Sequence, residues 1–134
     1  MKIKTMTLYV TDQEKALRFY TEKLGFQKKA DFSQGNYRWL TVVSAEETAG
    51  VELVLQASAF LPAGQTYQQA LYQQGMPAVM FFVDDLKKEH ERLQGQGVTF
   101  TQPPAKTTGS TIAMLDDTCG NRIQLTELDA WANK

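Results

Sequence analysis

The sequence predicts an α+β fold in which two tandem βαβββ modules form a curled mixed sheet around a cleft. The two halves of the chain show the same order of strand-like and helix-like patterns. They can also be aligned: MTLYVTDQEKAL matches VMFFVDDLKKEH when Val10 is placed on Val83, and VELVL matches IQLTE when Glu52 is placed on Gln124. The two offsets differ by one residue, so a single deletion reconciles them. Such self-similarity favours a duplicated unit over an open α/β sheet.

The first module is predicted over residues 1–56. Apolar and polar residues alternate from Lys2 to Val10, which is typical of a strand with Met6, Leu8 and Val10 on one face. Asp12 is a candidate N-cap for a helix from Gln13 to Leu24, and Gly25 is expected to close that helix. Three further strands are predicted at Phe26–Phe32, Tyr37–Val43 and Val51–Gln56.

The second module is predicted over residues 77–128. It begins with a strand at Val79–Val83, followed by the N-cap candidate Asp85 and a helix at Leu86–Gln94. Short strands are expected near Val98–Thr101, Thr111–Leu115 and Arg122–Thr126. Residues 57–76 form the predicted linker, in which the glutamine-rich stretch from Gln65 to Gln74 suggests a short helix.

Length and composition indicate one small globular domain over residues 1–134. The chain is 43% hydrophobic and 22% charged, and its net charge of −1 gives no reason to expect a nucleic-acid or anionic-membrane partner. The N-terminal segment is too polar for a signal peptide, and no stretch approaches the roughly 20 apolar residues of a membrane helix. Cys119 is the single cysteine, which fits a reducing compartment. We therefore expect a soluble, cytoplasmic protein.

Four segments carry a resemblance to a known family. VTDQEKALRFYTEKLGF, VELVL, FFVDDL and DDTCGNRIQL resemble the corresponding parts of the vicinal oxygen chelate superfamily, which includes glyoxalases, bleomycin resistance proteins and extradiol dioxygenases. The resemblance covers nearly the whole chain and implies the glyoxalase/bleomycin resistance/dioxygenase fold. It also implies a homodimer, because members of the family often build the cleft from more than one chain. In its enzymes a divalent metal chelates two neighbouring substrate oxygens.

The metal-ligand positions of the family fall on Thr5, Glu52, Ala78 and Gln124. Threonine is a poor ligand for such metals and alanine is none, whereas a catalytic ion needs at least three nitrogen or oxygen ligands. His90 is the single histidine and lies in a charged helical segment that we expect to be solvent-exposed. We therefore expect no metal or other cofactor, with weak binding of a divalent metal through Glu52 as the alternative.

Two polar residues and five apolar ones are the candidate ligand contacts. Glu52 is the best candidate for binding a polar or cationic group, or for a general base, although it could instead form a salt bridge with Arg38 or Arg122. Gln124 is its counterpart in the repeat. Strand alternation places several apolar side chains toward the predicted cleft, where some could simply fill space or a dimer interface: Tyr9, Trp39, Met80, Phe82 and Met114.

These observations predict a homodimeric protein that binds a small, partly aromatic molecule at a degenerate metal site. A metal-dependent lyase, isomerase or dioxygenase of the same superfamily is the alternative, with ligands supplied across a dimer interface. A third hypothesis is an interaction module whose cleft is vestigial. Cys119 lies in a predicted hairpin loop with no neighbouring base, so we expect no catalytic role for it.

Overall fold

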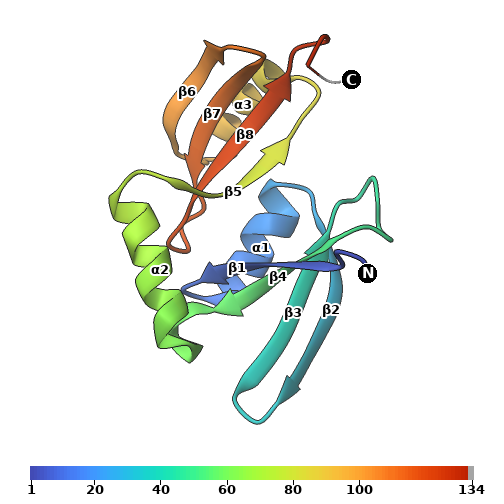
Figure 1. Cartoon of the computed structure of the whole chain (residues 1–134), viewed down its shortest axis with the longest axis vertical. Helices are drawn as coiled ribbons and strands as arrows, with labels where there is room; N and C mark the ends of the chain where they lie inside the picture. Colours follow the sequence, from blue (N-terminus) through green and yellow to red (C-terminus); the bar gives the residue numbers. More distant parts are fainter. Residues whose placement is uncertain (133–134) are drawn as a thin grey trace. The chain divides into compact units, whose positions relative to one another are not determined.

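The computed structural model describes residues 1–132 and divides into two compact units, with the boundary after Ala70. Each unit contains one four-stranded mixed sheet (Figure 1). The first sheet has the strand order β1-β4-β3-β2 and the second has the order β5-β8-β7-β6. In both, the first strand of the module pairs in parallel with the last, and the remaining pairs are antiparallel. The predicted α+β class and the two βαβββ modules are therefore confirmed.

The first unit holds the elements of the first module and most of a linking helix. Its strands are β1 (Thr5–Val10), β2 (Gln27–Gln34), β3 (Tyr37–Val43) and β4 (Glu52–Ala57). Between β1 and β2 lie α1 (Gln13–Arg18) and the π-helical turn η1 (Phe19–Lys23). After β4 come the short 3₁₀ helix η2 (Ser58–Phe60) and α2 (Pro62–Gln73), which crosses the boundary between the units.

The second unit repeats this order. Its elements are β5 (Pro77–Phe82), α3 (Leu86–Gly95), β6 (Phe100–Thr107), β7 (Ser110–Asp116) and β8 (Arg122–Leu128). No helix within residues 1–132 combines the length and apolarity needed to cross a membrane.

Equivalent carboxylates begin the helix of each module. The Asp12 side chain accepts a hydrogen bond from the backbone N–H of Lys15 at 3.0 Å, and Asp85 accepts one from Lys88 at 3.1 Å. Each bond satisfies a backbone donor that the first helical turn leaves without a partner. The N-caps predicted from the repeat are thus confirmed. Gly25 takes the predicted left-handed conformation after the first helical segment, with φ of 84°.

Several boundaries differ from the sequence-based expectation, and three of the differences have a clear local reason. The helix predicted from Gln13 to Leu24 changes to π-helical geometry at Phe19, where the Leu24 N–H donates to the Phe19 carbonyl at 3.2 Å. α2 begins at Pro62, which is well suited to the first helical position because that position needs no N–H donor. β6 continues past Thr101 through two prolines. It can do so because it is an edge strand and its pairing with β7 is irregular between Gln102 and Ala105.

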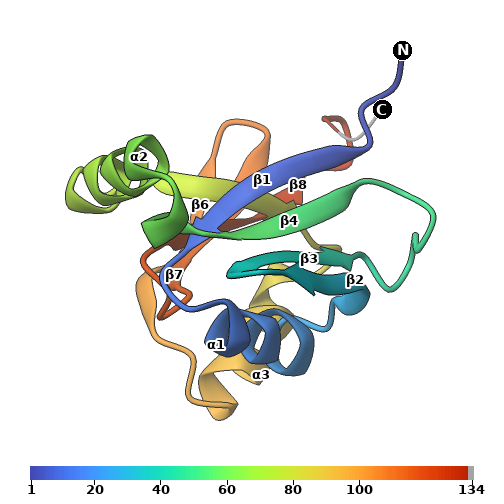
Figure 2. The ribbon, with the colours of Figure 1, turned by 90° about the horizontal axis from the view of Figure 1, so that it is seen from below.

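One face of each sheet is closed by a helix. In the first unit α1 lies against the sheet (Figure 2), and Ala16 is buried together with side chains of β1, β3 and β4: Leu8, Val10, Leu40, Val42 and Leu55. In the second unit Leu86 and Leu93 of α3 are buried together with Ala113, Leu115, Ile123 and Leu125 of β7 and β8. Because side chains alternate along a strand, the residues between these core positions lie on the opposite face of each sheet.

Candidate functional site

The face of the first sheet opposite α1 carries a carboxylate among aromatic side chains. We call it the first open face and take it, from the alternation and pairing of the four strands, to include Thr5, Thr7, Tyr9, Phe32, Tyr37, Trp39, Thr41, Glu52, Val54 and Gln56. The sequence-predicted contacts Tyr9, Trp39 and Glu52 are all on it. Tyr37 and Phe32 also belong to it, because Tyr37 is two residues from Trp39 on β3 and Phe32 pairs with Trp39.

Glu52 is half-buried, and its carboxylate has one hydrogen-bond partner among residues 1–132. The Thr41 hydroxyl donates to Glu52 Oε1 at 2.7 Å, and Glu52 pairs with Thr5 across the parallel strands. Its other carboxylate oxygen, Oε2, has no hydrogen bond within residues 1–132 and is not buried. This oxygen can therefore accept a hydrogen bond from a molecule on the first open face.

Arg38, one of the two arginines considered as a partner of Glu52, is engaged with other carboxylates. Arg38 instead forms a bidentate pair with Asp31, with both N–O distances 2.9 Å, and a second ion pair with Glu14 at 2.8 Å. Hydrogen bonds from Arg38 hold the pKa of Asp31 below its usual value of 3.8. The salt bridge between Glu52 and Arg38 is therefore wrong. Arg122 belongs to the second unit and stacks on a tyrosine ring there, and its pairing with Glu52 stays a prediction.

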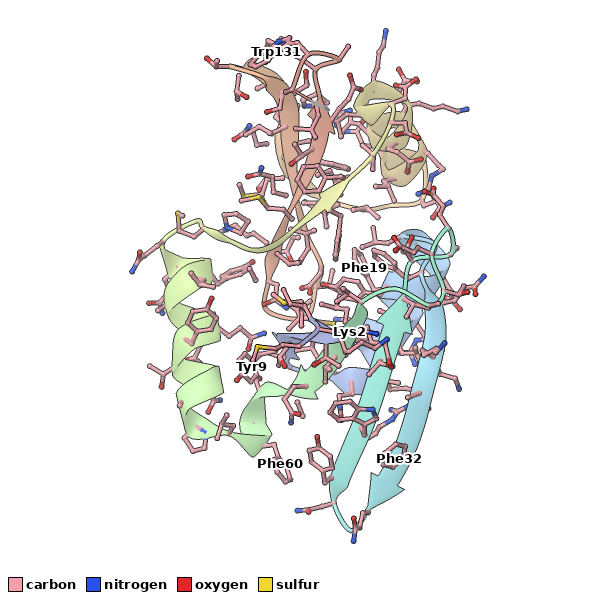
Figure 3. The ribbon with its side chains drawn as sticks, turned by 45° about the vertical axis from the view of Figure 1, so that its right-hand side comes forward. Lys2, Tyr9, Phe19, Phe32, Phe60 and Trp131 are labelled. Carbon is pink, nitrogen blue, oxygen red and sulfur yellow. The ribbon has the colours of Figure 1, made fainter. Side chains whose placement is uncertain are left out.

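Further aromatic rings extend the first open face beyond the sheet. Tyr67 of α2 meets Tyr9 edge-to-face with ring centroids 6.4 Å apart, and Phe60 of η2 meets Tyr37 in the same way at 5.2 Å. Figure 3 labels Tyr9, Phe32 and Phe60, which come from three different elements of this unit. Phe32 and Tyr67 expose 64% and 56% of their surface, so apolar area is available for contact with another molecule.

Gly64 allows α2 to approach this face closely. A Cβ atom at position 64 would stand 2.4 Å from Cε1 of Tyr9, which is far inside van der Waals contact. The Gln68 side chain, one turn further along α2, donates to the Tyr9 carbonyl at 2.8 Å. The absence of a side chain at Gly64 therefore leaves room for the Tyr9 ring.

The corresponding face of the second sheet brings together the other predicted contacts. This second open face is defined by Met80, Phe82, Ile112, Met114, Asp116, Arg122, Gln124 and Thr126. Gln124 Nε2 donates to Thr126 Oγ1 at 3.1 Å and lies 3.7 Å from the Met80 sulfur. Met80 and Phe82 expose 52% and 61% of their surface. A polar amide is thus surrounded by apolar and sulfur-containing side chains.

The metal-ligand positions of the family are not equivalent in the two units. Thr5 pairs directly with Glu52, whereas Gln124 pairs with Met80. Ala78 lies in the irregularity between Pro77 and Val79, two residues before Met80. Within residues 1–132, no group of three or more His, Cys, Asp or Glu side chains is placed to hold a metal ion.

An aspartate, a tyrosine and an arginine meet at one end of the second open face. The Tyr72 hydroxyl donates to Asp116 Oδ2 at 2.5 Å, and the Arg122 guanidinium carbon lies 4.3 Å from the centre of the Tyr72 ring. Tyr72 and Asp116 also line a pocket of about 350 Å³ with Thr99, Thr118 and Gly120. Neither Tyr72 nor Asp116 is predicted from the sequence to contact a ligand, because their contact depends on how the last turn of α2 meets the end of β7.

That loop is held by a buried side chain. Asp117 is fully buried and its Oδ1 accepts the backbone N–H groups of Cys119 and Asn121, while Oδ2 accepts the Asn121 amide at 2.9 Å. Thr118 takes a left-handed conformation with φ of 62°. Cys119 is also fully buried, so the loop is a structural turn rather than a site for an exposed thiol.

His90 does not lie on a solvated helix face, as its charged neighbours had suggested. It is half-buried and meets the Phe100 ring edge-to-face with centroids 4.5 Å apart. Its Nε2 is buried without a hydrogen-bond partner in the described part of the chain. The expectation was wrong because the histidine is on the side of α3 that packs on β6.

Comparison with known proteins identifies the family. The sequence model of the Glyoxalase/Bleomycin resistance protein/Dioxygenase superfamily matches residues 2–125. The chain belongs to this superfamily. The resemblance inferred from the four sequence segments is thereby confirmed.

Relatives of known sequence or structure cover almost the entire chain. The uncharacterized protein YurT from Bacillus subtilis (strain 168) is 49% identical over 127 residues, which are 95% of this chain and 99% of YurT. The crystal structure of UcmS2 is similar with a TM-score of 0.81 and 32% identity, covering 95% of this chain and 98% of UcmS2. TnmS3, an antibiotic binding protein from Streptomyces sp. CB03234, has a TM-score of 0.75 and 30% identity, covering 96% and 97% of the respective chains.

Within this superfamily member, the Tyr72–Asp116 contact has an electrostatic consequence. The hydrogen bond to the Asp116 carboxylate raises the pKa of the Tyr72 phenol above its usual value of 10.0, and the charge of Asp116 acts in the same direction. The nearby Arg122 charge opposes the shift. Because the folded-state pKa is raised, the contact stabilises the fold below pH 10 and is lost as the pH rises through the raised value.

We expect Asp116→Asn to lower the pKa of Tyr72 toward 10.0, because an amide oxygen accepts the phenol hydrogen without a negative charge. Titration of the tyrosine Cζ resonance by ¹³C NMR, assigned with Tyr72→Phe, measures the change. Asp129→Asn is the matched control, since Asp129 pairs with Lys106 instead. An unchanged Tyr72 pKa in Asp116→Asn would contradict the assignment.

Proposed function

We propose that the protein is a homodimeric, metal-independent binding protein for a small, partly aromatic molecule, and that the open face of each unit is a ligand-contacting surface. The observation that carries the proposal is the accessible oxygen of Glu52 on a face otherwise rich in aromatic rings. Binding sites for small molecules commonly combine apolar walls with a few placed polar groups. The similarity to TnmS3, described as an antibiotic binding protein, supports the same role for this chain.

Each predicted contact has a distinct role in this proposal. Glu52 accepts a hydrogen bond from a hydroxyl or cationic group of the ligand, while Thr41 fixes the orientation of its carboxylate. Tyr9 and Trp39 supply flat apolar contact on the first open face. Met80, Phe82 and Met114 do so on the second, where the flexible thioethers adapt to ligands of different outline, and Gln124 offers a polar contact beside them.

The residues at the family's metal positions do not fit a catalytic divalent ion. Thr5 offers a neutral hydroxyl, Ala78 offers no donor atom, and the Gln124 amide is engaged with Thr126. Glu52 is then the one carboxylate among the four positions. Three or more nitrogen or oxygen ligands are needed to hold such an ion with room for substrate, so we propose that the metal site is degenerate.

We expect Trp39→Ala to weaken binding of aromatic probes by about fivefold, because an aromatic contact contributes about 1 kcal/mol. Isothermal titration with 2-naphthamide and with 2-naphthylmethylammonium measures the loss. Glu52→Gln is expected to weaken the cationic probe selectively, since it removes the charge and keeps the shape.

Trp131→Ala is the matched control for this experiment. Trp131 is 64% exposed and lies beside Gly109, outside both open faces, so its loss should leave both affinities unchanged. Equal affinities of Trp39→Ala and the unaltered protein for both probes would argue against the first open face as a binding surface.

Divalent metals are not expected to stabilise the protein. Thermal melts with nickel, manganese, zinc and ferrous ions test this, because a ligand at one hundred times its dissociation constant stabilises the native state by about 2.7 kcal/mol. A rise in Tm with one ion that disappears in Glu52→Ala would instead support the metal-dependent lyase, isomerase or dioxygenase.

The homodimer implied by the family resemblance stays a prediction. Light scattering coupled to size-exclusion chromatography is expected to give twice the chain mass of 15.1 kDa. A constant mass of one chain across a range of concentrations would rule the dimer out.

A further inference from the structure

The Arg122 guanidinium stacks on an aromatic ring but has no anionic partner within residues 1–132. The ring is that of Tyr72, and Cζ of Arg122 lies 4.3 Å from the ring centre. Nε of Arg122 is buried and has no hydrogen-bond partner in the described part of the chain. A buried donor on a charged group is costly to leave unsatisfied, so an anionic acceptor bound at this guanidinium would offset part of that cost.

The neighbouring carboxylate does not neutralise Arg122. Asp116 pairs directly with Arg122 across β7 and β8, which is the usual setting for a cross-strand ion pair. Both of its oxygens are engaged elsewhere: Oδ1 accepts the Thr118 N–H at 2.7 Å and Oδ2 accepts the Tyr72 hydroxyl at 2.5 Å. Tyr72 thus has two effects, since its ring supports the guanidinium and its hydroxyl holds the competing carboxylate.

The position of Arg122 determines what kind of anion it can reach. Arg122 and Gln124 are alternate residues of β8 and therefore lie on the same face of the sheet. Met80 and Met114 flank Gln124 on the adjacent strands, and Phe82 follows Met80 on β5. The charge is therefore at one end of a row of apolar and sulfur-containing side chains.

We propose that the second open face recognises an aromatic carboxylate, with Arg122 binding the carboxylate and Met80, Phe82 and Met114 contacting the ring. The planar guanidinium matches a carboxylate with two parallel hydrogen bonds, which a neutral amide cannot reproduce. Met side chains adapt to the edges of a flat ring. The inference rests on the proposed function in one respect, namely that an aromatic molecule contacts this face.

The test compares 2-naphthoate with 2-naphthamide, which share a ring system and differ in charge. Isothermal titration of the full chain is expected to show tighter binding of 2-naphthoate. Arg122→Gln should weaken 2-naphthoate by about 10-fold to 100-fold and leave 2-naphthamide unchanged. Arg92→Gln is the matched control, because Arg92 is an α3 surface residue paired with Glu89 and should keep the preference for the carboxylate.

A second pair of variants tests the arrangement itself. Tyr72→Phe keeps the ring but releases Asp116 Oδ2, so Asp116 competes for Arg122 and the preference for 2-naphthoate should fall. Adding Asp116→Asn to Tyr72→Phe removes the competing charge and should restore the preference. Rescue by a second substitution would not follow from a general loss of folding, which thermal melts of each variant also check.

The outcomes separate this inference from the proposed function. If 2-naphthamide binds in a Trp39-dependent manner and 2-naphthoate binds no better, the carboxylate inference is overturned and the binding function stands. If Arg122→Gln leaves the affinity for 2-naphthoate unchanged, the inference is likewise overturned. If neither probe binds the unaltered protein, both proposals fail.

Discussion

A four-stranded sheet with a single helix on it has one face that its own module leaves uncovered, and the organisation of this protein depends on that constraint. α1 and α3 each close one face and bury its aliphatic side chains. Because alternate residues of a strand point in opposite directions, the same strands must present a second set of side chains to another environment. The two sets have different chemistry: the helix-facing set is aliphatic, whereas the open set is mainly aromatic, sulfur-containing and polar, with Val54 and Ile112 as its aliphatic members. Glu52 and Gln124 lie in the open set, where partial exposure makes a carboxylate and an amide tolerable.

The fold could be predicted because its signals are local and occur twice. Asp12 and Asp85 are N-caps that depend only on neighbouring residues, and strand alternation assigned Tyr9, Met80 and Phe82 to a face without knowledge of the pairing. The boundaries that differed depend on tertiary context. β6 continues through two prolines because no strand pairs with its outer edge, and edge position is not visible in a sequence.

The candidate site could be predicted less completely than the fold, for two separate reasons. The place of Tyr37 could be predicted from strand alternation alone, since it is two residues from Trp39 on the same strand. Tyr72 and Asp116 were beyond such reasoning, because residues 44 positions apart meet only through the path of α2. The strand register of the second module was also beyond sequence reasoning. In the alignment of the two halves Glu52 corresponds to Gln124 and Thr5 to Ala78, yet Glu52 pairs with Thr5 whereas Gln124 pairs with Met80, two residues after Ala78. Duplicated modules can therefore keep the same topology while corresponding side chains have different neighbours.

Gly64 gives the first open face a simple route to diversification. The Tyr9 ring occupies the space that any side chain at position 64 would need. Replacing this one glycine by any other residue would displace an aromatic ring of the face. The glycine itself lies on α2 and has no side chain that could contact a ligand. The outline of a recognition surface can then change during evolution, or in a directed library, while its composition stays the same. A position of this kind controls shape independently of chemistry, which makes it a natural place for paralogous proteins to diverge in what they accept.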